Sequence, residues 1–162
     1  MNKIRTFTSS CLSLVLLTGT VYAEQSADSR VETALDSLRI KYEKTSANDF
    51  KVLLDTENGR DQIVTLNSNT SEYLDLELRE VWSTAFISDG PLTPKIMRKL
   101  LLENASMKFG SWEIVEVSNG DAVVFRATVA ANTKEENIER TMGLVARAAD
   151  RMEKALTNAD DR

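Results

Sequence analysis

Two periods of apolar residues alternate along the chain, and each period predicts a different kind of element. Apolar residues at spacings of four and three, from Val31 to Leu38, predict a helix over residues 29–41. Ser29 and Glu32 have the spacing of a capping box, in which each side chain bonds a backbone N–H of the other residue. The chain is therefore expected to open with an amphipathic helix.

A period of two follows the first helix. Phe50, Val52 and Leu54 occupy alternate positions, and a second apolar run covers residues 63–66. Between them lies Asn58-Gly59, a pair that tolerates the positive φ angles of a tight hairpin turn. The two runs are therefore expected to form an antiparallel hairpin.

A third strand is predicted from near Leu74 to Ile87. Its apolar residues move from even to odd positions at Glu80-Val81. Because an extra residue in a strand produces such a change, we expect a bulge or bend at this point.

The second half of the chain continues with a helix and a further hairpin. Thr93-Pro94 has the pattern of a helix start, with threonine as the N-cap and proline in the first turn. Residues 112–117 and 122–129 then resemble two strands, and Asn119-Gly120 between them predicts a tight turn.

The last predicted helix is the longest. Thr133 and Glu136 have the spacing of a second capping box. The apolar residues that follow are four, three, four, three and four positions apart, which indicates a single buried seam: Ile138, Met142, Val145, Ala149, Met152 and Leu156.

These elements predict an α+β fold, drawn as a two-layer sandwich. A five-stranded antiparallel sheet is expected to carry the helices on one face, in the order helix, three strands, helix, two strands, helix. No linker or repeat divides the chain, so residues 24–157 are expected to form a single domain followed by a frayed tail at 158–162.

The first 23 residues have the pattern of a cleavable signal peptide. Lys3 and Arg5 precede an apolar run at 11–19, which is too short to span a membrane, and Val21-Tyr22-Ala23 supplies small residues at the cleavage positions. We therefore predict cleavage after Ala23, export to the periplasm and no membrane anchor. The alternative is an uncleaved N-terminal helix.

Removal of the leader changes the composition. The chain has 162 residues and a net charge of −5; without two basic residues of the leader, 139 residues with a net charge of −7 remain. The only cysteine, Cys11, is lost with the leader, and the chain contains no histidine. An acidic chain without a basic run is a poor ligand for nucleic acid, so no nucleic-acid partner is expected.

The same composition restricts catalysis and cofactor binding. Without histidine or mature cysteine, the commonest general base, metal ligand and thiol nucleophile are missing. The glycines do not form a phosphate-binding loop, and residues 55–61 match a calcium loop poorly. We therefore expect no cofactor, no metal and no catalytic residues.

Four segments resemble the YbjN-like family, bacterial proteins described as sensory transduction regulators. They are residues 34–43 (ALDSLRIKYE), 49–55 (DFKVLLD), 76–82 (LELREVW), and 100–104 (LLLEN) followed by 110–113 (GSWE). The resemblance implies a fold similar to type III secretion chaperones, small domains that commonly dimerise and bind extended segments of other proteins. It implies no agreed activity, and those chaperones are cytoplasmic.

Two small groups of residues are candidates for binding. Arg79, Glu80 and Trp82 combine a charged pair with a tryptophan, which is typical of protein recognition surfaces. The alternative is an ion pair of Arg79 with Glu77 on a solvated face, with Trp82 in the core, where Trp112 is also expected.

Gly143 is the one glycine expected inside a helix. With Ala146 it would allow another backbone to approach closely, as at a dimer interface, whereas the alternative is a tolerated surface glycine.

The sequence thus favours an exported, non-catalytic binding or adaptor domain that acts on a protein partner in the bacterial envelope as a homodimer. The alternative is a hydrolase of envelope polymers that relies on carboxylates, for which Asp55, Glu77 and Glu80 are the candidates. A third possibility is a domain that stabilises an envelope assembly by packing alone.

Overall fold

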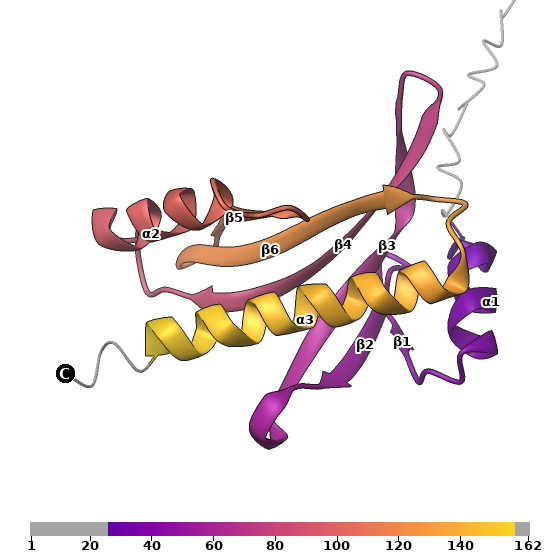
Figure 1. Cartoon of the computed structure of the whole chain (residues 1–162), viewed down its shortest axis with the longest axis horizontal. Coiled ribbons are helices and arrows are strands. Elements are labelled where there is room, and N and C mark those ends of the chain that lie inside the picture. The colour runs from indigo at the N-terminus through magenta and orange to yellow at the C-terminus, as the bar shows by residue number, and fades with distance from the viewer. Residues whose placement is uncertain (1–25, 158–162) are drawn as a thin grey trace, which may run out of the picture.

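An antiparallel sheet is crossed by a long C-terminal helix in the computed structural model, which describes residues 26–157 (Figure 1). The predicted signal peptide and the tail at 158–162 lie outside these residues. The elements are α1 (Ser29–Ser37), β1 (Glu43–Lys44), β2 (Phe50–Asp55), the 3₁₀ turn η1 (Glu57–Gly59), β3 (Asp61–Tyr73), β4 (Leu76–Ile87), α2 (Pro94–Asn104), β5 (Ser111–Val117), β6 (Gly120–Ala130) and α3 (Glu135–Thr157).

The sheet has six strands in the order β1-β2-β3-β4-β6-β5, and every neighbouring pair is antiparallel. The α+β class is therefore confirmed, but the expectation of five strands is wrong. The additional strand is β1, whose two residues pair with Phe50 and Lys51 of β2. Two residues are too few to produce an alternation that sequence patterns could reveal.

The strands β3 and β4 form a hairpin that is longer than predicted. Their register shifts between Leu66 and Thr70, so three residues of β3 lie opposite Glu80 of β4. The irregularity lies where the sequence predicted a bend, but the extra residues belong to β3. A second shift occurs in β4 between Thr84 and Phe86, against β6.

The tip of this hairpin projects beyond the helices (Figure 1). Tyr73 pairs with Leu76 around a two-residue turn in which Leu74 has a φ of 57°. A bulky residue rarely adopts this left-handed conformation, and the Leu74 side chain is 85% exposed. The turn thus holds an apolar side chain out in solvent at some conformational cost.

The two Asn-Gly pairs play roles other than those predicted. Gly59 has a φ of 70°, but it ends a 3₁₀ turn within a five-residue loop. Gly120 pairs with Val117, so the turn residues are the two before Gly120. Gly120 instead allows a close approach, because a Cβ there would lie 2.1 Å from the Ser88 carbonyl oxygen.

Of the three N-capping residues predicted from the sequence, one is confirmed. Thr93 caps α2 by accepting a hydrogen bond from the Ile96 N–H, as predicted. Asp28, not Ser29, caps α1 through the Arg30 N–H at 2.9 Å. Helix α1 also ends earlier than expected, and Thr133 accepts from the Asn137 side chain instead of capping α3.

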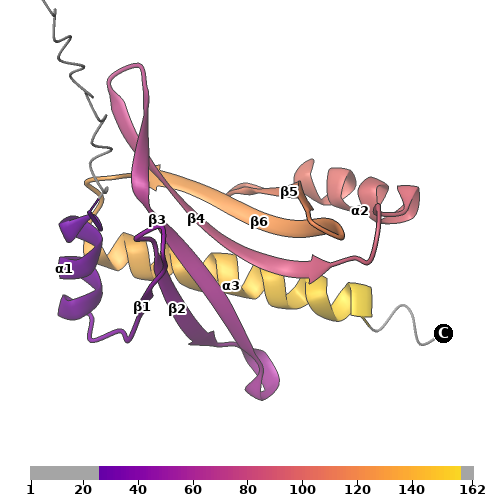
Figure 2. The same cartoon turned by 180° about the vertical axis from the view of Figure 1, so that it is seen from behind.

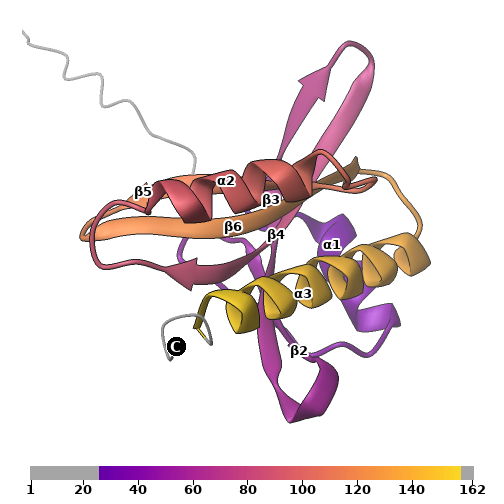
Figure 3. The same cartoon turned by 60° about the vertical axis from the view of Figure 1, so that its left-hand side comes forward.

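The predicted seam of α3 is confirmed. All six of its apolar residues are buried, and α3 crosses β3, β4 and β6 while its first half lies beside α1. Helix α2 packs on β5, at the other end of the sheet (Figure 3). Trp112 of β5 is buried as expected, with its ring 5.0 Å from that of Phe125 in an edge-to-face contact.

The start of the edge strand β5 is held by a side chain of α2. The Asn104 amide accepts from the Trp112 N–H at 2.7 Å and donates to the Trp112 carbonyl at 3.0 Å. This amide satisfies both outward backbone groups of Trp112, as a neighbouring strand would.

Candidate functional site

The structure does not bring Arg79, Glu80 and Trp82 together on one face. Arg79 lies on the side of β4 that faces the helices and is only 1% exposed. Glu80 and Trp82 have the opposite strand parity and are half-buried on the reverse face. A joint surface of all three residues is therefore wrong, as is the alternative that places Arg79 in solvent and Trp82 in the core.

Arg79 connects the hairpin to the start of α1. Its guanidinium donates to the carboxylate of Asp28 at 2.5 Å, to the Ser68 carbonyl at 3.1 Å and to the Asn67 carbonyl. The Arg79 Nε is buried and has no hydrogen-bond partner. Since a buried cation needs a counter-charge, Asp28 is the residue that makes this position tolerable.

A second arginine extends the cluster to solvent. Arg30 donates to both oxygens of Glu77, at 2.7 and 2.6 Å, and also to Asp28. These bonds from Arg30 hold the pKa of Asp28 well below its usual range, opposed by desolvation and assisted by Arg79. They also lower the pKa of Glu77 to about 2, with a smaller contribution from Thr70. The cluster fastens α1 to the β3–β4 hairpin.

On the reverse face, a polar network fixes Trp82. The Asn67 side chain accepts from the indole N–H at 2.9 Å and donates to Glu80 at 3.1 Å. Arg126 then bonds both Glu80 and Glu113, the latter at 2.7 Å. The bulge in β3 supplies Asn67, so the irregular strand orients the tryptophan.

Next to Trp82 the sheet divides. Trp82 pairs with Thr65, but no ladder pair joins β3 and β4 between this point and their ends at Asp61 and Ile87 (Figure 2). A groove of about 550 Å³ opens between the diverging strands. We call it the split groove; it is lined by Lys51, Asp61, Gln62, Ile63, Thr65, Trp82, Thr84, Ala85, Phe86, Ile87, Glu153 and Thr157.

The floor of the split groove is closed by side chains. Gln62 of β3 accepts from the Ser83 hydroxyl of β4 at 3.1 Å and donates to Glu153 of α3. Arg60 adds ion pairs to Asp150 and Glu153, at 2.7 and 3.0 Å. Beneath the groove, the Gln62–Ser83 bond thus joins β3 to β4 and the bonds of Gln62 and Arg60 join β3 to α3, while the two strand backbones do not pair.

The rim of the split groove is apolar and accessible. Ile63 and Ile87 are 53% and 62% exposed and Trp82 is half-buried between the two strands. A neighbouring groove of about 940 Å³, between β2 and the chain that follows α1, shares Ile63 and Lys51 and adds Leu53. The two grooves meet at Lys51 and Ile63 on the reverse face of β2 and β3, and Leu53 and Ile63 are the exposed apolar side chains at this junction.

Sequence patterns found only Trp82 of this site. The sequence predicts the strand that carries Ile63, but an apolar run over residues 63–66 does not show which of its side chains face outward. Ile87 was taken as the end of a strand. Only the pairing of strands, which joins residues far apart in sequence, shows that Ile63 and Ile87 face a common groove.

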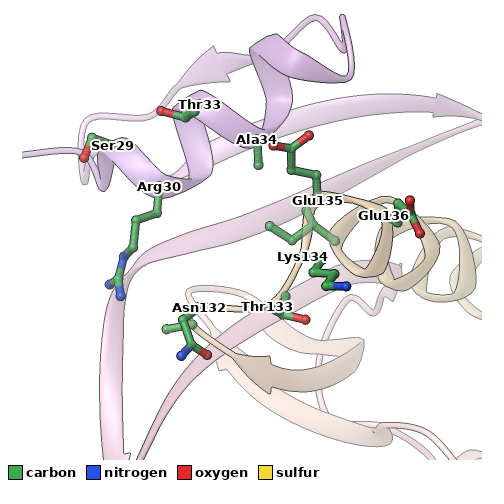
Figure 4. Close-up of a pocket in the computed structure, with 11 residues that line it drawn as sticks. Ser29, Arg30, Thr33, Ala34, Asn132, Thr133, Lys134, Glu135 and Glu136 are labelled. Carbon is green, nitrogen blue, oxygen red and sulfur yellow. The ribbon is translucent and has the colours of Figure 1, made fainter.

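A third groove lies between α1 and the start of α3 (Figure 4). Its lining is mostly polar, and two of its charged groups are held by partners: Arg30 bonds Asp28 and Glu77, and Glu135 accepts from Ser37 at 2.6 Å. Such satisfied groups favour a structural contact between the first and last helices over a binding site.

Gly143 and Ala146, the residues predicted to form a dimer contact, lie next to other segments of the same chain. Gly143 and Ala146 line a groove between α3 and the residues Ile40 and Leu54. Ala146 is only 2% exposed, and a Cβ on Gly143 would lie 3.3 Å from the Arg147 guanidinium. The pair therefore offers little surface to a second copy.

The three carboxylates considered for hydrolysis are separated. Asp55 ends β2 opposite Asp61, Glu77 is bound to Arg30 on the α1 side, and Glu80 lies on the reverse face. Within residues 26–157, no group of three or more histidine, cysteine or acidic side chains is placed to hold a metal ion.

No protein-family model matches the chain, and no curated protein matches it. The resemblance to the YbjN-like family thus stays a prediction. Among the helices of residues 26–157, none is long and apolar enough to cross a membrane.

Proposed function

We propose that this protein is a non-catalytic binding domain that holds an apolar, extended segment of a partner protein in the split groove. The observation that carries the proposal is the divergence of β3 and β4, which leaves Ile63, Trp82 and Ile87 around an accessible groove. Groups of apolar side chains with a tryptophan anchor are typical of protein-binding sites. The rigid network around Asn67 favours binding because it orients Trp82 in advance.

We place this activity in the bacterial envelope, after export and cleavage behind Ala23, and in a homodimer of YbjN-like subunits. The leader pattern and the segments quoted above support these points. Mass spectrometry of the protein purified from the periplasm is expected to show a chain beginning at Glu24, and light scattering a dimer. A full-length chain found in the cytoplasm would contradict export, and a monomer would contradict the homodimer.

A photo-crosslinking amino acid tests the groove. We expect p-benzoylphenylalanine at position 63 or 87 to form the same discrete adduct in cells. The matched control is position 101, because Leu101 is 70% exposed but lies on α2, away from the groove. In the purified protein, Trp82→Ala is expected to abolish binding of the captured partner. An equal adduct at position 101, or unchanged affinity of Trp82→Ala, would overturn the proposal.

The carboxylate hydrolase is not favoured by any grouping of residues, since Asp55, Glu77 and Glu80 occupy three separate surroundings. It stays testable by single replacement of these three residues in a screen against envelope polymers.

A further inference from the structure

The split groove holds unpaired strand edges as well as apolar side chains. We infer that the partner segment binds as an additional β-strand, antiparallel to β3, along residues 61–64. This inference rests on the function proposed above and specifies its ligand: an extended segment with alternating apolar and small hydroxyl side chains.

The backbone of β3 is directed into the groove at two residues. The Arg60 carbonyl accepts from the Thr56 N–H at 2.7 Å, and the ladder to β2 continues from there without a register shift. In an antiparallel ladder, successive residues direct their N–H and C=O groups to opposite sides. Even residues of β3 therefore bond to β2, whereas Asp61 and Ile63 direct theirs into the groove.

On the opposite side of the groove, β4 is a less regular template. The Glu77 carbonyl accepts from the Ala131 N–H, so odd residues of β4 face β6 and Thr84 faces the groove. The register shift that follows Thr84 interrupts this edge after one residue. A strand inserted between β3 and β4 is antiparallel to only one of them, and antiparallel pairs are the more stable. The regular edge therefore favours β3, and the segment is expected to run antiparallel to it because that is the more stable kind of pair.

The same geometry fixes which side chains the segment carries. A residue that exchanges hydrogen bonds with Ile63 places its own side chain on the face of Ile63 and Trp82, which favours an apolar residue. Its neighbours point toward Gln62 and Glu153 on the α3 side, which favours small hydroxyl residues. In the bound segment, the apolar residues therefore supply the backbone bonds to β3.

The test measures binding of the peptide acetyl-KTVTVTK-amide to the full mature protein by NMR titration. Two variants carry N-methyl groups, one on both valine amides and one on the two threonine amides that follow them. N-methylation removes the amide donor without altering the protein. Because each lost hydrogen bond costs about 0.5–1.5 kcal/mol, methylated valines are expected to weaken binding roughly tenfold or more. Methylated threonines are expected to have a smaller effect.

Hydrogen exchange gives a second readout. The Ile63 amide is expected to become protected when the unmodified peptide binds. The control is the amide of Ile114, which also points outward, because it lies two residues beyond the Trp112 N–H that Asn104 holds. Its exchange is expected to stay unchanged.

The outcomes separate this inference from the proposed function. Equal affinities for all three peptides, with the Ile63 amide still exchanging freely, would overturn strand addition but leave a side-chain docking site. If neither the unmodified peptide nor its two N-methylated variants bind at all, the proposed function falls with the inference. Selective loss with methylated valines together with protection of Ile63 would support both.

Discussion

Removing the carboxylate of Asp28 is expected to destabilise the whole domain. Arg79 is 1% exposed, and among residues 26–157 its only ionic partner is Asp28, whose side chain is 12% exposed. In Asp28→Ala, the guanidinium keeps two backbone carbonyls, from Asn67 and Ser68, but no counter-charge. Helix α1 also loses the acceptor at its N-cap.

The expected magnitude follows from these two losses. Breaking a buried ion pair by removing one partner costs about 3–5 kcal/mol, and loss of a cap costs about 1 kcal/mol. The two carbonyls that remain on Arg79 reduce the first contribution, so we expect about 3 kcal/mol in total. The matched control is Glu32→Ala, which removes the half-exposed ion pair of α1 with Lys44 and a hydrogen bond from Tyr42, and which is expected to cost much less than Asp28→Ala.

Urea unfolding, followed by the fluorescence of Trp82 and Trp112, measures both variants. The free energy of unfolding falls linearly with urea concentration, and an equal slope in each variant shows that the same surface is exposed on unfolding. A third variant, Asp28→Ala with Arg79→Met, removes both charges and is expected to recover most of the loss. A cost of Asp28→Ala below that of Glu32→Ala, or no recovery in the double variant, would refute the assignment of Arg79 as a buried charge that depends on Asp28.

Three further outcomes are expected in the same assay. Because the folded-state pKa of Glu77 lies near 2 and its ordinary value is 4.5, its stabilising effect is complete above about pH 4.5 and lost as the pH falls toward 2; Glu77→Gln is expected to reduce this acid sensitivity. Gly120→Ala places a Cβ 2.1 Å from a backbone oxygen and should lower the free energy of unfolding by about 3 kcal/mol. Gly143→Ala in α3 should raise it by up to about 1 kcal/mol. Similar effects of the two substitutions would contradict the close approach at Gly120. Leu74→Asn, which suits a φ of 57° better, should raise stability by about 0.5–1 kcal/mol, and a loss would show that the leucine contributes to the fold.

Local periodicity was sufficient for the parts of the fold that one helix or strand determines alone. The seam of α3 from Ile138 to Leu156 and the cap at Thr93 were correct because each depends on residues within a few positions. Strand β1 was missed because Glu43 and Lys44 are two exposed residues, and only their pairing with β2 makes them a strand.

Features that depend on distant residues could not be predicted in this way. Arg79 occupies an odd, core-facing position of β4, but a charged side chain reads as exposed unless its partner is known. That partner, Asp28, lies 51 positions earlier. The split groove depends likewise on where the pairing of β3 and β4 stops, and no local pattern of Ile63 or Ile87 contains this information.

The contact between the first and last helices has a consequence for the order in which the chain can fold. Helix α1 is synthesised before the other elements of residues 26–157, yet it lies against α3, and Ser37 bonds Glu135, 98 positions later. Until residues 135–157 have been synthesised, the face of the sheet that α3 covers has no partner. Nascent chains that lack this segment are therefore expected to be protease-sensitive and to bind chaperones. The domain is therefore expected to reach its folded state only once residues 135–157 are available to cover the sheet.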